Sequence, residues 1–252
     1  MAEETDMKIL EVIGVTRHFG SVTALKDVSF SLSEDEIVGL IGPNGVGKTT
    51  LVNLITGIIP YSAGDIRYFG KSIQGLKPHQ IGRLGISHTF TASPPLTKMS
   101  AQENVMVGAL YGKSGRKRGG RAAQKRAEEA LDFFGLSAKK NVPVEELNVF
   151  ERKRVEMAAA LATSPKFLLL DETMAGLNAP ELDDAVRLIK KIREVGVTIL
   201  VIEHVMKAIT EVSDRIIVLH HGQKIMEGRP EVVLKDRKVI EAYLGERYGA
   251  IT

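Results

Sequence analysis

Cysteine is absent from this chain of 252 residues. Its absence excludes disulfide bonds, thiolate metal sites and a cysteine nucleophile. Long apolar stretches are also absent, because no run approaches the roughly 18 residues that a membrane-spanning helix requires. The first residues, MAEETDMKIL, lack the positive start and apolar run of a secretory signal peptide, so we expect none. A role at a membrane would therefore depend on another chain.

Positive and negative residues nearly balance over the whole chain, but one segment carries a local excess of positive charge. The formal net charge of +3 is too small to indicate nucleic-acid binding. Residues 112–126, GKSGRKRGGRAAQKR, carry seven Lys or Arg and no acid. A solvated loop is the favoured interpretation of this basic stretch. Contact with anionic lipid headgroups is the second, and nucleic acid the third, because no aromatic residues interleave the basic ones.

Short apolar runs bounded by turn residues alternate with amphipathic segments. Runs that are apolar on both faces are typical of central strands in a parallel sheet covered by helices. The spacing of apolar residues predicts helices at 48–58 and 179–196. This alternation predicts an α/β architecture. The expected strands are residues 28–32, 36–42, 167–171, 198–204 and 215–222.

The middle of the chain differs, because residues 92–160 contain no convincing strand pattern. AQENVMVGAL, RAAQKRAEEALDFFG and ERKRVEMAAALA all have helical patterns. We therefore expect one domain over 1–252, with a core of about 1–91 and 161–252 and an inserted helical lobe of about 92–160.

GPNGVGKT, at residues 42–49, matches G-x-x-x-x-G-K-[ST] between an expected strand and an expected helix. Glycines in such a loop let backbone N–H groups surround phosphate oxygens at the positive end of the helix. Lys48 should reach the β- and γ-phosphates of ATP, and the Thr49 hydroxyl should ligate Mg²⁺. The alternative, a glycine-rich turn with a chance lysine, does not explain this setting. The expected nucleotide-binding residues are Gly42, Pro43, Asn44, Gly45, Val46, Gly47, Lys48, Thr49 and Thr50.

FLLLDE, at residues 167–172, ends a buried strand in two carboxylates. In P-loop ATPases an acid at this place holds Mg²⁺, and Asp171 fits that role. Glu172 would polarise the attacking water as a general base. The alternative is a strand that ends in two solvated acids, and the nearby P-loop motif counts against it.

The order of these motifs resembles the ATP-binding subunit of an ABC transporter over nearly the whole chain. The shared order is the P-loop, the helical segment, FLLLDE, AGLN at 175–178 and VIEH at 201–204. The resemblance implies a P-loop NTPase core of the RecA-like type, with a mostly parallel sheet, an antiparallel β portion and an inserted helical lobe. It also implies ATP and Mg²⁺ as cofactors.

The same resemblance assigns roles to residues whose types alone are weak indicators. His204 would be the switch-loop histidine that contacts the γ-phosphate, and Phe19, in RHFG, would stack on adenine. His204 could otherwise be an ordinary loop residue, and Phe19 a core residue. The loop expected to cross a dimer interface is Ala175, Gly176, Leu177 and Asn178.

ENVMVG, at 103–108, and KVIEAYLG, at 238–245, resemble the ATPases of branched-chain amino-acid and related importers. That resemblance implies a subunit that energises import of a small solute from the cytoplasmic face of the cell membrane. The implied partners are a second ATPase chain, two integral membrane permease subunits and, indirectly, a solute-binding protein. A homodimer is the alternative to this heterodimer. The basic stretch suggests the longer ATPase chain of the pair.

The family's signature motif, Leu-Ser-Gly-Gly-Gln, is altered here. The matching residues are Leu147, Asn148, Val149, Phe150 and Glu151. Asn148 and Glu151 still suit a helix start. The two bulky side chains stand where backbone should approach phosphate, and Glu151 adds negative charge, so we expect impaired function. The alternative is that Asn148 and the helix dipole suffice.

A second departure is Thr91, which replaces the family's glutamine in the sequence HTFT. Thr91 could still contact a water on Mg²⁺ with a shorter reach. Two other functions remain open: a non-transport ABC ATPase, and a nucleotide-gated scaffold that hydrolyses little ATP. Neither two cassettes nor a long coiled coil is present, which counts against the first.

Overall fold

The computed structural model describes residues 8–89, 96–112 and 119–248, without the side chains of 244–248. The chain forms two compact units. The first unit joins residues 1–78 to 198–252, and the second is residues 79–197. The division expected from the sequence, into a core and a helical lobe, separates strands from helices rather than compact units. That division stays a prediction.

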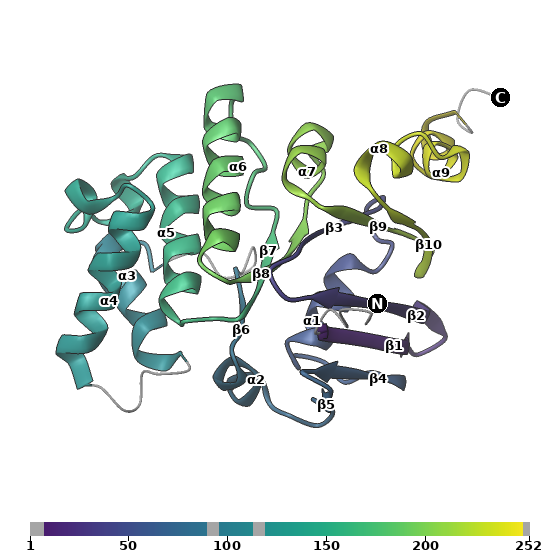
Figure 1. Cartoon of the computed structure of the whole chain (residues 1–252), viewed down its shortest axis with the longest axis horizontal. Coiled ribbons are helices and arrows are strands. Elements are labelled where there is room, and N and C mark those ends of the chain that lie inside the picture. Colours follow the sequence, from purple (N-terminus) through teal and green to yellow (C-terminus); the bar gives the residue numbers. More distant parts are fainter. Residues whose placement is uncertain (1–7, 90–95, 113–118, 249–252) are drawn as a thin grey trace, which may run out of the picture. The chain divides into compact units, whose positions relative to one another are not determined.

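The first unit contains an antiparallel sheet near the N-terminus (Figure 1). Inward residues of its strands, such as Leu25, Val28 and Leu32, are fully buried. Gly20, at φ +58°, makes the tight turn that joins the first two strands. In the order β2-β1-β4-β5 the strands are β1 Lys8–Phe19, β2 Val22–Ser33, β4 Ala63–Tyr68 and β5 Lys71–Ser72.

The first unit also contains four neighbouring strands in the order β10-β9-β3-β8. β3 is parallel to both of its neighbours, and only β10 is antiparallel. Every residue of β3 and β8 is buried, as expected for central strands. The strands are β3 Ile37–Ile41, β8 Thr198–Ile202, β9 Arg215–His220 and β10 Gln223–Gly228; the helices are α1 Lys48–Ile55, α7 Met206–Val212, α8 Pro230–Val233 and α9 Arg237–Tyr248.

A charged cluster ties three strands of the first unit together. The Arg215 guanidinium lies 2.6 Å from a carboxylate oxygen of Glu36 and also pairs with Glu227. It donates a further hydrogen bond to the Ser31 carbonyl. These side chains are largely buried, so removing one partner would leave a poorly solvated charge.

The second unit is mostly helical, with two parallel strands (Figure 1). Helices α3 and α5 approach closely because Gly108 has no side chain; a Cβ there would lie 2.0 Å from the Ala159 carbonyl oxygen. The elements are α2 Pro78–Leu84, β6 Ile86–His88, α3 Ala101–Tyr111, α4 Gly119–Phe133, two 3₁₀ turns at Ser137–Lys139 and Val144–Glu146, α5 Val149–Ala162, β7 Phe167–Asp171 and α6 Ala179–Glu194.

The predicted α/β class is confirmed, as are the strands near 36–42, 167–171, 198–204 and 215–222. The helix expected at 48–58 is shorter and ends at Ile55, because Gly57 turns into a left-handed conformation at φ +71°. The strand expected at 28–32 is the second half of β2, and the sequence reasoning missed β1, β4, β5, β6 and β10.

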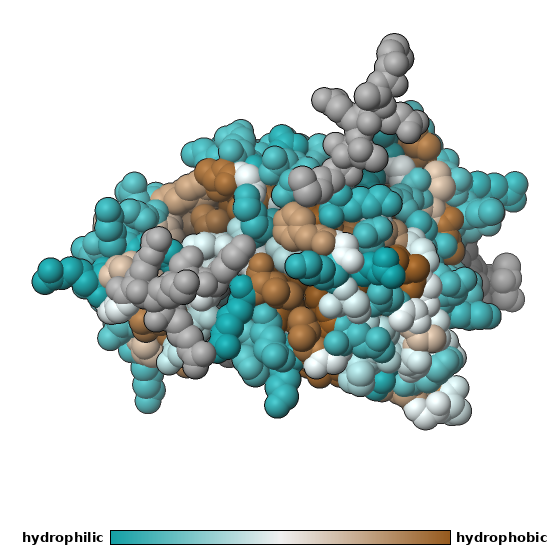
Figure 2. Space-filling view, turned by 60° about the horizontal axis from the view of Figure 1, so that its bottom comes forward, coloured by the Kyte–Doolittle hydropathy of each residue, from teal (hydrophilic) through white to brown (hydrophobic). Residues whose placement is uncertain are grey.

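No helix among the described residues is long and apolar enough to cross a membrane. On the face drawn in Figure 2, hydrophilic residues cover most of the surface, and hydrophobic residues reach it in several separate places.

His88, which is half-buried at the end of β6, makes stability depend on pH. Burial lowers the pKa of His88 from 6.5 to about 4. Between these values the unfolded chain binds more protons than the folded one, so the free energy of unfolding falls as the pH falls. From pH 7.5 to 5.0 we expect this group to remove about 2 kcal/mol, measured by urea unfolding. In His88→Gln the acid-induced loss should shrink by that amount, and an undiminished loss would contradict the prediction.

Candidate functional site

The P-loop runs from the end of β3 to the start of α1, as predicted. Gly42 and Gly47 have φ values of +154° and +107°, which side chains rarely adopt. A Cβ on Gly42 would lie 2.2 Å from the Leu219 carbonyl oxygen, and one on Gly47 would lie 2.6 Å from that of Ala24. Only glycine fits at these two positions, and the bare backbone N–H groups can then turn toward an anion.

Lys48 is already folded back over this loop. Its Nζ donates hydrogen bonds to the carbonyl oxygens of Gly42, at 2.6 Å, and Pro43, at 2.8 Å. The side chain is only 7% exposed, while Asn44 and Thr49 are exposed. The ammonium group therefore stands within the loop, where phosphate oxygens could exchange with carbonyl oxygens as its acceptors. This buried cation and the glycine cradle fit a triphosphate.

His204 follows the strand that pairs beside the P-loop strand. The parallel register sets Leu40 of β3 opposite Ile202 of β8. Gly42 and His204 each come two residues later, so both leave the sheet at the same edge. His204 is exposed, and its backbone N–H lies 3.4 Å from a carboxylate oxygen of the buried Glu203. An exposed imidazole at this edge fits the expected γ-phosphate contact.

Phe19 lies at the end of β1 and is 45% exposed, so it is not a core residue. The Arg17 guanidinium carbon lies 4.5 Å from the centre of its ring. Arg17 pairs with Leu25, and Leu25 contacts the position where a Cβ on Gly47 would stand. The exposed aromatic ring thus belongs to the hairpin that packs beside the P-loop, as adenine stacking requires.

Asp171 and Glu172 belong to the second unit, at the end of β7. The buried Thr89 fixes this end from β6, because its N–H donates to the Leu169 carbonyl and its hydroxyl accepts from the Asp171 N–H, at 3.0 and 3.1 Å. Both carboxylates are half-buried. Thr91, two residues beyond Thr89, lies outside the described residues, so its expected role stays a prediction.

The altered signature motif starts α5 with a complete capping box. The Asn148 side chain accepts from the Glu151 N–H at 2.8 Å, and the Glu151 carboxylate accepts from the Asn148 N–H at 3.0 Å. Lys139 lies 3.1 Å from the same carboxylate. These partners hold the pKa of Glu151 below its ordinary value against the opposing effect of burial. Glu151 therefore stays ionised, and the nearby Lys139 ammonium partly offsets the charge that was expected to repel phosphate.

The two bulky signature residues point in different directions. Phe150 is 6% exposed, and the Arg154 guanidinium carbon lies 4.6 Å from its ring centre. Val149 is 56% exposed. The expectation that both side chains obstruct the motif is therefore wrong for Phe150, which packs into the second unit. Only Val149 remains at the surface of the helix start.

The segment 175–178 is a surface loop in the second unit. Ala175, Gly176 and Asn178 are exposed, and Leu177 is half-buried. Gly176 has φ +79° with open space around it. Asn178 caps α6 in a second capping box with Glu181. This exposure fits a loop that contacts a partner, which stays a prediction.

The comparisons with known proteins agree with these motifs. The sequence profile of the family described as "ABC transporter" matches residues 25–175. The chain belongs to the ABC transporter family. A second profile, described as "Branched-chain amino acid ATP-binding cassette transporter", matches residues 223–249. ATP-binding subunits of this family are ATPases coupled to transport, and this chain is such an ATPase.

Two similar relatives extend over almost the whole chain. The high-affinity branched-chain amino acid transport ATP-binding protein BraF of Pseudomonas aeruginosa is 38% identical over 250 residues. The corresponding protein LivG of Escherichia coli K12 is 36% identical over 251 residues. In both comparisons the match covers 94% of this chain and 98% of the relative.

Solved ABC structures share the fold. The ADP conformation of an ATP-binding cassette has a TM-score of 0.86 and 32% identity, covering 95% of this chain and 99% of that one. A dimeric post-hydrolysis cassette bound to ADP and Pi has a TM-score of 0.78 and 26% identity, covering 88% and 98%. The predicted P-loop NTPase class is thereby confirmed.

The sequence reasoning missed one residue beside the P-loop of this ABC protein. Tyr243, in α9, has a buried hydroxyl without a hydrogen bond of standard geometry among the described residues. Burial raises the pKa of Tyr243 to about 12, and the facing Gly42 backbone opposes that shift. Tyr243 lies in KVIEAYLG, whose resemblance to importer ATPases was noted from the sequence, but that resemblance does not predict that Tyr243 faces Gly42.

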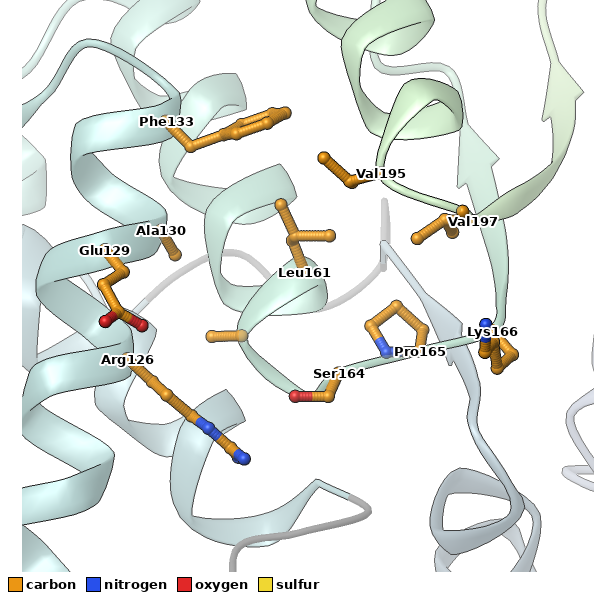
Figure 3. Close-up of a pocket in the computed structure, with 12 residues that line it drawn as sticks. Arg126, Glu129, Ala130, Phe133, Leu161, Ser164, Pro165, Lys166, Val195 and Val197 are labelled. Atoms are coloured by element: carbon orange, nitrogen blue, oxygen red, sulfur yellow. The ribbon is translucent and has the colours of Figure 1, made fainter. Parts of the chain in front are cut away.

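A separate hollow of about 460 Å³ lies within the second unit. Figure 3 shows Phe133 of α4, Leu161 of α5 and Val195, after α6, gathered on one side of it. Leu161 belongs to the last turn of α5, whereas the signature motif begins that helix, roughly 20 Å away along its axis. The hollow is thus no part of the signature motif.

The described residues contain no group of three or more His, Cys, Asp or Glu that could hold a metal ion unaided. Mg²⁺ commonly takes one or two protein ligands and completes its shell with phosphate oxygens and water. Thr49 and Asp171 carry oxygens of the required type.

Lys48→Met should remove the cation that phosphate needs while keeping the length of the side chain. Losing charge-assisted hydrogen bonds to phosphate should weaken ATP binding by roughly tenfold or more. Titration of the purified chain with a fluorescent ATP analogue measures this. Lys71→Met, on the exposed strand β5, is the matched control and should bind like the wild type. Unchanged affinity in Lys48→Met would contradict the assigned role.

Proposed function

We propose that this chain is the ATP-hydrolysing subunit that energises import of a small solute, in the branched-chain amino-acid class, at the cytoplasmic face of the membrane. The observation that carries the proposal is the P-loop itself, with its glycine cradle and buried Lys48. The similarity to BraF and LivG over 94% of the chain supports the substrate class. The C-terminal match at 223–249 supports it further.

Different residues bind the phosphates, bind the adenine and take part in hydrolysis of ATP. Backbone N–H groups of the P-loop and the positive end of α1 bind the phosphates, and Lys48 adds a full charge. Phe19 stacks on the adenine. Thr49 and Asp171 are the residues that would hold Mg²⁺, whose positive charge would offset the negative charge of the phosphates. Glu172 accepts the proton of the attacking water, and His204 donates a hydrogen bond to the γ-phosphate.

The P-loop site of this chain is preserved whereas its signature motif, residues 147–151, is altered. This difference supports a heterodimer over a homodimer. The P-loop face keeps five of its expected groups, namely Lys48, Thr49, Asp171, Glu172 and His204. The signature face keeps its capped helix start but has Val149 where the family has glycine. We infer that this chain's P-loop works with an intact signature on a second ATPase chain. Its own signature would close a weaker site on that partner. Two membrane permease subunits and a solute-binding protein would complete the transporter.

The first test measures steady-state ATP hydrolysis by the purified chain, with ATP binding determined in parallel. We expect ATP to bind but turnover to be negligible, because the partner's signature is missing. Glu172→Gln is the control for background hydrolysis and should bind ATP like the wild type. Brisk turnover that disappears in Glu172→Gln would contradict the need for a partner signature. Absence of ATP binding would contradict the proposed function altogether.

Restoring part of the signature should raise the turnover of the chain alone. Asn148→Ser combined with Val149→Gly removes the exposed side chain while keeping a capping residue, so we expect roughly tenfold faster hydrolysis. Phe150 is left in place because its ring is buried, and Phe150→Gly should cost about 3 kcal/mol or more of stability. Unchanged turnover in the double variant would show that Val149 is not what limits hydrolysis.

The altered signature also favours a second candidate, a nucleotide-gated scaffold that binds ATP but scarcely hydrolyses it. The ATPase subunit and the scaffold predict different rates of ATP hydrolysis in the assembled transporter. An ATPase subunit gives solute-stimulated hydrolysis there that depends on Glu172, whereas a scaffold gives hydrolysis that Glu172→Gln leaves unchanged.

A further inference from the structure

One contact joins the signature helix to the catalytic strand end within the second unit. The ammonium group of Lys153, on α5, donates a hydrogen bond to the main-chain carbonyl oxygen of Glu172 at 2.9 Å. The two residues are 19 positions apart in the chain, and the bond is partly buried. It therefore reflects tertiary packing, and solvent competes with it less than with an exposed contact.

The backbone of Glu172 needs such a support. Glu172 has φ +50°, in the left-handed region that non-glycine residues seldom occupy. A residue keeps this conformation only when its surroundings hold it there. The main-chain carbonyl is one of the groups whose direction this conformation sets, and a charged donor aimed at that carbonyl stabilises it. A hydrogen bond to this carbonyl restrains rotation about the Cα–C bond of Glu172, and so limits how the residue that bears the carboxylate can turn.

The helix that carries the donor is anchored at its start. Lys153 lies five residues after Asn148, the residue that caps α5. The capping box with Glu151 and the ion pair to Lys139 fix the start of the helix. Buried Val155, two residues after Lys153, fixes the inner face of the helix. The helix that begins at the signature motif thus carries the group that holds the catalytic glutamate of the same chain.

We propose that Lys153 is a positioning residue for ATP hydrolysis, which holds the left-handed backbone of Glu172 so that its carboxylate faces the attacking water. The proposal rests on the proposed function, since it assigns Glu172 the role of general base. Lys153 touches neither substrate nor the reacting carboxylate, so it acts only through the geometry of Glu172. A small misplacement of a catalytic group is enough to slow a reaction strongly.

The test uses the assembled transporter, purified with its membrane subunits, and measures kcat and KM for ATP. Lys153→Met keeps the aliphatic stem and removes the donor; we expect kcat to fall roughly tenfold while KM stays within about twofold. Lys153→Arg keeps a charged donor and should recover most of the lost kcat. Lys125→Met, on α4, is the matched control, because that side chain is 78% exposed and forms an ion pair across the surface with Glu129. It should behave like the wild type.

Thermal unfolding of each full-length chain separates positioning from folding. A fall in kcat that exceeds the loss of folded protein, with KM unchanged and arginine restoring activity, supports the proposal. An unchanged kcat in Lys153→Met overturns it. A fall that only follows the folded fraction, or that arginine fails to restore, overturns it as well. If the wild-type complex hydrolyses no ATP, the proposed function fails first, and the role of Lys153 fails with it.

Discussion

The parallel pairing of β3 with β8 is the constraint on which the P-loop site depends. Both strands are buried along their whole length, so a slip of one residue would turn every side chain to the wrong face. With Leu40 held opposite Ile202, the P-loop and His204 must leave the sheet at the same edge. Burial of apolar side chains thereby places the polar groups that meet the nucleotide.

The P-loop is shaped before nucleotide arrives. Glycines at 42 and 47 allow a backbone path that any Cβ would block, and Lys48 is held by the loop's own carbonyl oxygens. Binding phosphate then exchanges acceptors on an ammonium group that already stands in place. Such preorganisation lowers the ordering cost that binding would otherwise carry.

Helix α5 connects the signature motif with the end of β7 in the same unit. Its capping box holds Glu151 in place, Lys139 partly offsets the charge of that carboxylate, and Phe150 anchors the first turn inside the unit. What remains altered at the surface is the exposed Val149. One turn further along, Lys153 reaches Glu172. The helix start is therefore modified in its contact surface but preserved as a structural support, which suits a subunit with one strong and one weak site.

The sequence by itself determined the α/β class, the P-loop and the acids of FLLLDE, because these depend on local spacing and on residues adjacent in the chain. It did not reveal β1, whose pairing with β2 shifts register between Val12 and Val15 and so breaks the alternation that indicates a strand. Only the tertiary structure decided that the Phe150 ring is buried. It also decided that Glu151 pairs with Lys139 and that Lys153 donates to the Glu172 carbonyl. Each depends on which distant residue packs alongside, and spacing along the chain carries no information about that.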